Sequence, residues 1–498
     1  MPETKKWLIS ITVVFGAFMA VMDISVVNVA LPHMMGTFSE DLSTITWVAT
    51  GYSIAEIIMI TMAGWFSTLI GRKRLYLLSF AVFTLGSILC GTAVSFHQMM
   101  VYRIIQGLGG GALVPVSQAI LKEAFGKEEQ GMAMAIFGMG VVLAPAVGPI
   151  FGGWLTDHYG WPWIFYINVP VSIVGILMVM AFVEDPAYLK RGVNKIDWQG
   201  IVLLTLSLTS MQFVLERGQE KNWLESKEIC AGLLITLVTG LGLVLWELKA
   251  QEPIMNLRVL KNRALAVGSF VGLIFGMALF GTTFILPQFT QNLLGYSAFQ
   301  AGIVLAPRAV MLLIFMPVAG QLYRRFDVRG LLCFAILVLV WSYYDLSGLS
   351  LSAGFRKMVP TLVIMGIGMP FMFVPLSGIS LSTVSRTDMI HATSFYTLSR
   401  RIGGNIGYAV VATLVARGQQ VHRADLVAHV TPYNPNLSGY LHQLSGHLSG
   451  QGAMAFVDRV IIQQATMLAY NDVSMIFGLL FLAVLPFVFL LPSQHAQG

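Results

Sequence analysis

Charged residues are scarce in this chain. Only 11% of the 498 residues are Asp, Glu, Lys or Arg, whereas about 25% is usual for a soluble protein. Hydrophobic residues make up 56%. This composition excludes a water-soluble globule and predicts an all-α polytopic membrane protein.

Cysteine and clustered metal ligands are also scarce. Cys90, Cys230 and Cys333 lie far apart, so the spacing favours packing roles over zinc binding or a disulfide framework. No glycine-rich loop ends in Lys and Ser/Thr, and no two histidines share an apolar run, so we expect neither an enzyme nor a cofactor. Four histidines of one polar segment lack the close spacing of a metal site: His422, His429, His442 and His447.

Long apolar runs dominate what is present. A membrane span needs about 20 such residues. The first run follows Lys5 and Lys6 and is too long for a signal-peptide core. The runs predict fourteen transmembrane helices, near 8–31, 45–69, 75–94, 99–121, 131–156, 162–183, 197–215, 229–246, 264–289, 299–322, 331–350, 358–380, 392–416 and 472–492.

The distribution of positive charge orients these helices. An even number of spans puts both termini on one side, and the loops of that side carry more than twice as many Lys and Arg as the opposite loops. Both termini are therefore predicted to be cytoplasmic. The formal charge of +6 reflects this anchoring, so we expect membrane lipid and no nucleic acid as a partner.

An internal repeat predicts two bundles. Ala63-Gly64 and the following basic loop reappear 256 residues later at Ala319-Gly320. The offset equals eight spans, so two additional helices separate two six-helix halves, in the order six, two, six, and a substrate cavity is expected between the bundles. The predicted parts are 1–183 for the N-terminal six-helix bundle, 184–263 for the two extra helices and linkers, 264–416 for five helices of the C-terminal bundle, 417–471 for a periplasmic loop and 472–498 for the last helix and tail.

Ionisable residues deep in the spans are the first functional candidates, because a charge in hydrocarbon is costly. Asp23 and Arg103 differ in predicted depth by only about 5 Å, given a rise of about 1.5 Å per residue. They could pair. Glu56 falls near the middle of the second span. We predict proton coupling by Asp23, Glu56 and Arg103; a purely structural hydrogen-bonded role is the alternative for each acid.

Other polar residues are assigned to a substrate cavity. These are Arg308 and Arg400, with Asn28 and Gln106 from the first half. Arg401 is the weaker candidate beside Arg400. Acids in the first half favour cationic substrates and arginines in the second favour weak acids, so the sequence leaves the substrate charge open.

The fifth span predicts a bent interface helix. Small residues recur at four-residue spacing, which allows close helix contact. Pro145 and Pro149 interrupt the hydrogen-bond ladder between them. We expect this helix to pack against the other bundle. The small residues are Gly140, Ala144, Gly148 and Gly152.

Four motifs resemble one family. Asp23-Ile24-Ser25-Val26-Val27-Asn28-Val29-Ala30-Leu31-Pro32 resembles the first-span signature of the fourteen-span drug:proton antiporters of the major facilitator superfamily. Arg103-Ile104-Ile105-Gln106-Gly107 is similar to the span-four motif, whose arginine is associated with proton transfer. Gly148-Pro149-Ile150-Phe151-Gly152-Gly153 resembles the span-five antiporter motif, and Trp161-Pro162-Trp163-Ile164-Phe165-Tyr166-Ile167-Asn168-Val169-Pro170 resembles the lead-in to span six. The loop after span two, which contains Gly71-Arg72, departs from the family at Thr68, where an acid is usual.

The likeness to EmrB-type members extends to Leu215-Glu216-Arg217-Gly218 and Asn434-Pro435-Asn436. It implies proton-coupled multidrug efflux of amphipathic toxic compounds by alternating access across the bacterial inner membrane. It also implies an EmrA-like periplasmic adaptor and a TolC-like outer-membrane channel. The alternative is a stand-alone facilitator or exporter of one metabolite.

The long polar segment has two interpretations. Helical spacing of Met454, Val457, Ile461 and Leu468 predicts an amphipathic hairpin. This hairpin either lies on its own bundle or the outer lipid surface, or docks the adaptor.

Overall fold

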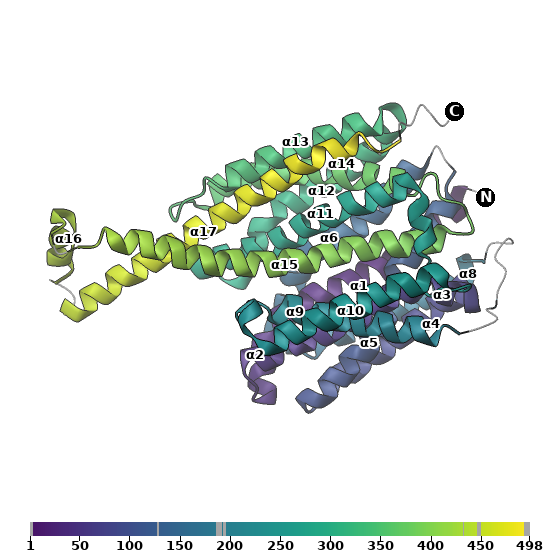
Figure 1. Ribbon diagram of the computed structural model, residues 1–498, viewed down its shortest axis with the longest axis horizontal. Coiled ribbons are helices and arrows are strands. Elements are labelled where there is room, and N and C mark those ends of the chain that lie inside the picture. The colour runs from purple at the N-terminus through teal and green to yellow at the C-terminus, as the bar shows by residue number, and fades with distance from the viewer. Residues whose placement is uncertain are drawn as a thin grey trace.

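The computed structural model describes residues 3–126, 129–185, 192, 196–431, 433–445 and 450–492 (Figure 1). Within these ranges the chain is helical, without β-strands, and fourteen of its helices have 15 residues or more. Twelve helices are long and apolar enough to cross a membrane, and the bent α6 (Gln130–Tyr159) could make a thirteenth. The predicted all-helical membrane fold is confirmed, while the count of fourteen spans stays a prediction.

The first bundle packs around α1 and α5. Local signals start its helices: the Ser95 side chain accepts a hydrogen bond from the Gln98 backbone N–H and begins α5. Gly71 joins α3 to α4 without a loop, and its φ of 92° lies in the left-handed region that favours glycine. The bundle consists of α1 (Glu3–Phe38), α2 (Leu42–Ile45), α3 (Trp47–Ile70), α4 (Arg72–Gly91), α5 (Phe96–Ala124), α6, α7 (Trp163–Tyr166) and α8 (Asn168–Phe182).

The second bundle repeats the first. Its helices are α11 (Arg263–Gln288), which continues as the π-helical turn Phe289–Leu293, α12 (Ala298–Arg325), α13 (Val328–Leu346), α14 (Phe355–Ser380), α15 (Met389–Ala428) and α17 (Gly450–Val488). Adding 256 to the bounds of α3, α4, α5 and α6 places them on α12, α13, α14 and α15, in agreement with the duplication seen in the sequence. Lys122 Nζ donates to the Gly378 carbonyl across the bundles at 2.8 Å. These two positions are 256 residues apart, so equivalent helices meet at the pseudo-twofold axis.

An additional helical hairpin has no counterpart in the repeat. It consists of α9 (Trp198–Arg217) and α10 (Lys227–Lys249), and α9 contacts both α3 and α15. The Asp197 carboxylate caps α9 and also accepts a hydrogen bond from Trp246 of α10 at 2.7 Å. One face of α10 exposes leucines at helical spacing, as expected for contact with lipid: Leu234, Leu237, Leu241 and Leu245.

The segment 417–471, predicted as a loop with a helical amphipathic stretch, is largely helical. Its two ends continue the neighbouring helices, since α15 runs to Ala428 and α17 begins at Gly450, with α16 (Pro435–Ser445) between them. The extended ends of α15 and α17 pair with each other and project beyond the bundle (Figure 1). They do not lie on the bundle, while a position at the outer lipid surface and a docking role both stay predictions. His447 and the tail 493–498 lie outside the described residues.

Both chain ends lie at the same end of the molecule (Figure 1). Two contacts near the N-terminus join it to the loops of this end: Lys5 pairs with Glu184 at 2.9 Å, and Lys6 pairs with Glu129 at 2.7 Å. The hydrogen bond from Lys6 is the main reason that the pKa of Glu129 lies below its usual value. This arrangement agrees with an even number of membrane crossings.

Candidate functional site

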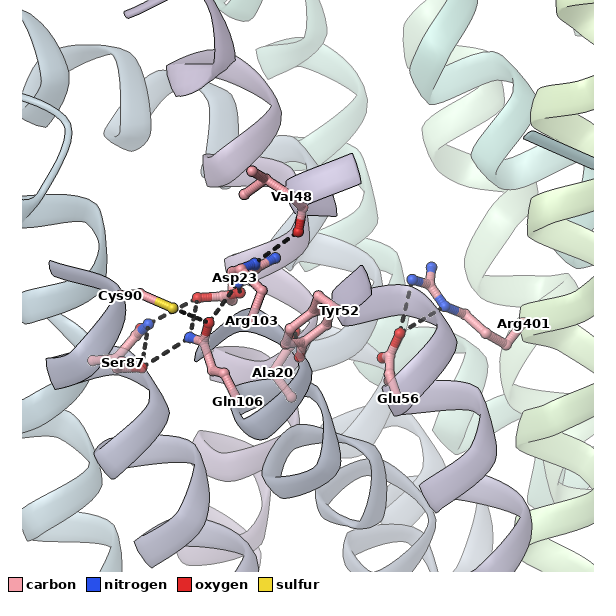
Figure 2. A network of polar contacts seen from close by, with 11 residues as sticks. Ala20, Asp23, Val48, Tyr52, Glu56, Ser87, Cys90, Arg103, Gln106 and Arg401 are labelled. Carbon is pink, nitrogen blue, oxygen red and sulfur yellow. Dashed lines mark hydrogen bonds and ion pairs between the residues drawn. The ribbon is translucent and has the colours of Figure 1, made fainter. Parts of the chain in front are cut away.

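A buried ion pair lies at the centre of the first bundle (Figure 2). Arg103 Nη1 on α5 lies 2.6 Å from Asp23 Oδ2 on α1. The two side chains are almost fully excluded from solvent. Arg103 also donates from Nε to the Val48 carbonyl at 3.1 Å, and its guanidinium carbon lies 4.2 Å from the centre of the Tyr52 ring. The structure thus brings together two of the three residues predicted to couple protons.

Three amide and hydroxyl side chains complete this network. Gln106 accepts a hydrogen bond from Arg103 at 2.5 Å and donates to Asp23 Oδ1 at 2.8 Å. Asn168 donates to the same carboxylate oxygen at 2.9 Å, and both amides contact Ser87. Gln106 therefore faces the ion pair. Asn168 and Ser87 were not predicted as site residues, although Asn168 lies in the quoted lead-in to span six.

Asn28 lies apart from this network. It is on α1, five residues beyond Asp23, and its side chain is exposed. The structure therefore does not bring this predicted cavity residue together with Gln106.

A second ion pair joins the two bundles. Glu56 Oε2 on α3 lies 2.8 Å from Arg401 Nη2 on α15 and accepts a hydrogen bond from Arg401 Nε at 3.0 Å (Figure 2). Tyr52 is one helical turn before Glu56 and stacks with Arg103, so it lies between the two pairs (Figure 2). The pairing makes Arg401 more important than the sequence indicated. A buried Glu56 needs a positively charged partner, and this need was the sequence signal that could have pointed to Arg401.

Arg308 and Arg400, the predicted cavity arginines, are both buried in the second bundle. Arg308 Nη2 donates to Thr283 Oγ1 at 3.3 Å. The guanidinium carbon of Arg400 lies 5.2 Å from the centre of the Phe373 ring. Each arginine has an Nη1 atom without a hydrogen-bond partner.

The inserted hairpin also reaches the boundary between the bundles. Asn405 on α15 donates to Gln212 on α9 at 2.5 Å, and Gln212 donates to Glu216 at 3.2 Å. Glu216 accepts a hydrogen bond from Thr50 on α3. A polar chain therefore runs from one bundle to the other through α9, one or two turns from the Glu56–Arg401 pair.

The predicted packing of α6 against the other bundle is confirmed, since α6 contacts α12 and α14. The glycines of its small-residue stripe contact α1 of their own bundle instead. A Cβ at Gly148 would lie 2.7 Å from Ser25, and a Cβ at Gly152 would lie 2.8 Å from Val26, both on α1. The opposite face of α6 meets the second bundle, where Ile150 contacts Gly302 of α12. Small residues occur where two helices approach each other most closely, but their spacing in the sequence does not identify the partner helix.

The structure also shows the surroundings of three other parts of the quoted motifs: the proline-containing bend of α6, Gly153 and Arg72. The halves of α6 on either side of Ala146 differ in direction by 45°, next to Pro145 and close to Pro149. Gly153 has Val29 of α1 as its nearest neighbour. Arg72, beside Gly71, is buried and pairs with Glu123 on α5.

Metal-ligand side chains are dispersed. Within the described ranges, no group of three or more His, Cys, Asp or Glu side chains could hold a metal ion.

Comparisons with known proteins agree with this architecture. Residues 13–408 match the Major Facilitator Superfamily model. The chain is 31% identical to the multidrug export protein EmrB of Escherichia coli K12 over 99% of this chain and 96% of the relative. It is 29% identical to the fatty acid resistance protein FarB of Neisseria gonorrhoeae over 98% of this chain and 97% of the relative.

Solved structures share the fold. The human organic anion transporter MFSD10 matches with a TM-score of 0.58 and 13% identity, over 97% of this chain and 100% of that chain. The proton:xylose symporter XylE matches with a TM-score of 0.59 and 13% identity, over 96% and 95% of the two chains. The shared architecture and the near full-length likeness to EmrB show that this chain belongs to the Major Facilitator Superfamily, among its EmrB-type multidrug export proteins.

Proposed function

We propose that the protein is a proton-coupled multidrug exporter that moves amphipathic toxic compounds out of the cytoplasm by alternating access. The observation that carries the proposal is the arrangement of two buried ion pairs, Asp23–Arg103 within one bundle and Glu56–Arg401 between the bundles. Both acids lie in membrane-spanning helices, where uncompensated charge is costly.

The contacts suggest how proton binding changes the conformation. A proton on Glu56 removes the charge that attracts Arg401, so it weakens a contact that holds α3 against α15. A proton on Asp23 leaves Arg103 without its counter-charge, while Gln106 and Asn168 still offer hydrogen bonds. Proton entry and bundle separation are thereby linked, because each state binds protons with a different affinity.

We place the transporter in the bacterial inner membrane with both termini in the cytoplasm. The basic sequence Arg72-Lys73-Arg74 begins α4 at the helix end that follows the first pair of spans, as the positive-inside rule requires. EmrB and FarB, named for multidrug export and fatty acid resistance, support amphipathic substrates.

The projecting hairpin is the proposed docking surface for an EmrA-like periplasmic adaptor, which would lead to a TolC-like channel. Apolar side chains remain exposed on its helices, among them Val421, Met454, Phe456 and Leu468. Val457, which the sequence suggested as a docking residue, is buried instead. The exposed set therefore offers the apolar face for a partner helix.

Transport by inverted membrane vesicles tests the proposal. Vesicles containing the protein should accumulate ethidium when their interior is acidic, and accumulation should stop when nigericin collapses the pH gradient. Accumulation that continues without any gradient would instead identify a facilitator. Vesicles without the protein provide the control.

A further inference from the structure

Two carboxylates meet at one end of the inserted hairpin. Asp197 begins α9, and Glu247 lies in the last turn of α10, which packs against α9. Among the described residues, neither acid forms an ion pair. Arg258, which follows α10, donates to the carbonyls of Leu248 and Ala250 rather than to either acid. The two negative charges therefore lack a counter-charge from these residues.

One oxygen of each carboxylate has no hydrogen-bond partner in the described part of the chain. Asp197 Oδ1 accepts hydrogen bonds from the Gly200 N–H at 2.9 Å and from Trp246 Nε1 at 2.7 Å, but the buried Oδ2 accepts none. Glu247 is 0% exposed; its Oε2 accepts a hydrogen bond from the Met255 N–H at 3.3 Å, whereas its Oε1 accepts none. Each acid thus uses one oxygen to fix its position and keeps the other free.

These two free oxygens face the same point. A Cβ added to Gly200 would lie 2.4 Å from Asp197 Oδ2 and 2.8 Å from Glu247 Oε1. A side chain at position 200 would therefore stand between the two carboxylates. Glycine at this position lets both oxygens approach one common centre from two different helices.

Such an arrangement calls for a cation. Two carboxylates that face each other repel, and burial strengthens the repulsion because the local dielectric constant is low. A shared proton would neutralise one of the two charges, whereas a divalent cation balances both. Mg²⁺ prefers oxygen ligands and is usually bound by one or two carboxylates, with water in several of the remaining positions. Two acidic side chains are therefore enough for such an ion, without the larger cluster of ligands that a closed metal site needs.

We propose that Asp197 and Glu247 bind a divalent cation of the Mg²⁺ type beside Gly200. The cation joins the start of α9 to the end of α10 through one oxygen of each carboxylate. Asp197 and Glu247 lie far apart in the sequence, so no motif predicts this site. The inference goes beyond the proposed efflux function and does not depend on it.

The position of the site indicates what the cation does. Glu247 also holds the segment after α10, since it accepts the hydrogen bond from the Met255 N–H. The preceding residue, Ile254, is buried in an apolar cluster with Ile57 of α3 and Leu398 of α15. The cation therefore fixes the inserted hairpin to a segment that contacts both bundles.

Binding of Mn²⁺ tests the inference directly, because Mn²⁺ takes the same oxygen ligands as Mg²⁺ and its electron paramagnetic resonance signal distinguishes free from bound ion. The purified full-length protein in maltoside micelles, stripped with EDTA and then freed of the chelator, should bind one Mn²⁺ per chain, and Mg²⁺ should displace it. D197N and E247Q should each weaken the apparent Mn²⁺ affinity about tenfold or more, because each removes one of the two charges.

These substitutions keep the other contacts of each side chain. Asparagine still offers an oxygen to cap α9, and glutamine still offers one to the Met255 N–H. G200A keeps both carboxylates but places a methyl group between their free oxygens, so it should weaken Mn²⁺ binding as well. D157N removes an exposed acid near the end of α6 and should leave Mn²⁺ binding unchanged.

Three results would overturn the inference. Absence of bound Mn²⁺ in the parent would show that the two oxygens do not hold a divalent cation. Undiminished binding in both D197N and E247Q would place the ion elsewhere in the chain. Stabilisation of the EDTA-treated parent by acidification, with no response to Mg²⁺, would show that the two carboxylates share a proton instead.

Thermal unfolding separates cation binding from a structural role of the acids. Mg²⁺ should raise the unfolding temperature of the EDTA-treated parent, whereas choline chloride at the same ionic strength should not. E247Q in EDTA should unfold at the same or a higher temperature than the parent, because it removes an uncompensated buried charge, and it should not respond to Mg²⁺. A clearly lower unfolding temperature of E247Q, with Mn²⁺ affinity retained, would make Glu247 structural and contradict the inference.

Discussion

The Glu56–Arg401 pair should stabilise the conformation described here, because it joins α3 of one bundle to α15 of the other. Glu56→Gln keeps the shape of the side chain and removes its charge. The change leaves Arg401 buried without a counter-charge, and breaking a buried pair in this way typically costs about 3–5 kcal/mol. Arg401→Gln should have a comparable effect for the converse reason.

The size of this effect decides how far the conformational equilibrium moves. A difference of about 3 kcal/mol changes an equilibrium constant by roughly a hundredfold. The double variant Glu56→Gln/Arg401→Gln removes both charges, so it should recover much of the loss. The double-mutant cycle should yield a coupling energy of about 2 kcal/mol or more.

Distances between spin labels measure the populations directly. One label replaces Val94, in the loop before α5, and the other replaces Ser352, in the corresponding loop before α14; both positions are exposed. The native cysteines Cys90, Cys230 and Cys333 are first replaced by Ser. In each single variant, a larger fraction of the molecules than in the parent should show a second distance between the two spin labels. A coupling energy near zero, or distance distributions that are the same in all four proteins, would refute a role of this pair in holding the bundles together.

Three further variants test other parts of the account. Asp23→Asn should insert in the membrane but lose substrate-driven proton flux in vesicles; flux at the parental rate would contradict its coupling role. Gly152→Leu should clash with Val26 of α1 and destabilise the first bundle by about 1–3 kcal/mol, and an unfolding temperature equal to that of the parent would show that the helices separate easily there. Met454→Asp with Phe456→Asp should abolish adaptor co-purification and resistance in cells while vesicle transport persists; retained co-purification would exclude docking at this surface.

Much of the helical architecture could be predicted from the sequence, because apolar length and repeated loop motifs report directly on membrane spans. The same repeat anticipated the correspondence between α3 and α12. The continuation of α15 to Ala428 was missed, since its polar composition resembles a loop when the stabilising partner is unknown, whereas the helical spacing of Met454 to Leu468 did predict the start of α17. Arg423 and Asp458 illustrate this: they pair across the hairpin at 2.7 Å, although 35 residues separate them.

The candidate site was only partly predictable. Depth within the predicted spans correctly suggested that Asp23 and Arg103 could pair, because the two residues were expected at nearly the same depth. Depth does not reveal which face of a helix a residue occupies, so the pairing of Glu56 with Arg401 rather than Arg400 required the structure. For the same reason, the spacing of Gly148 and Gly152 predicted close packing but not that the neighbour is α1.

We propose that this transporter exchanges substrate for protons held by Asp23 and Glu56. Proton release from the purified protein in weakly buffered detergent solution is the measurement, with ethidium added as substrate and a pH indicator as the readout. We predict that the parent releases protons when substrate binds and that Asp23→Asn combined with Glu56→Gln abolishes the release. Substrate binding without proton release by the parent at every pH tested, or release that is undiminished in the double variant, would contradict it.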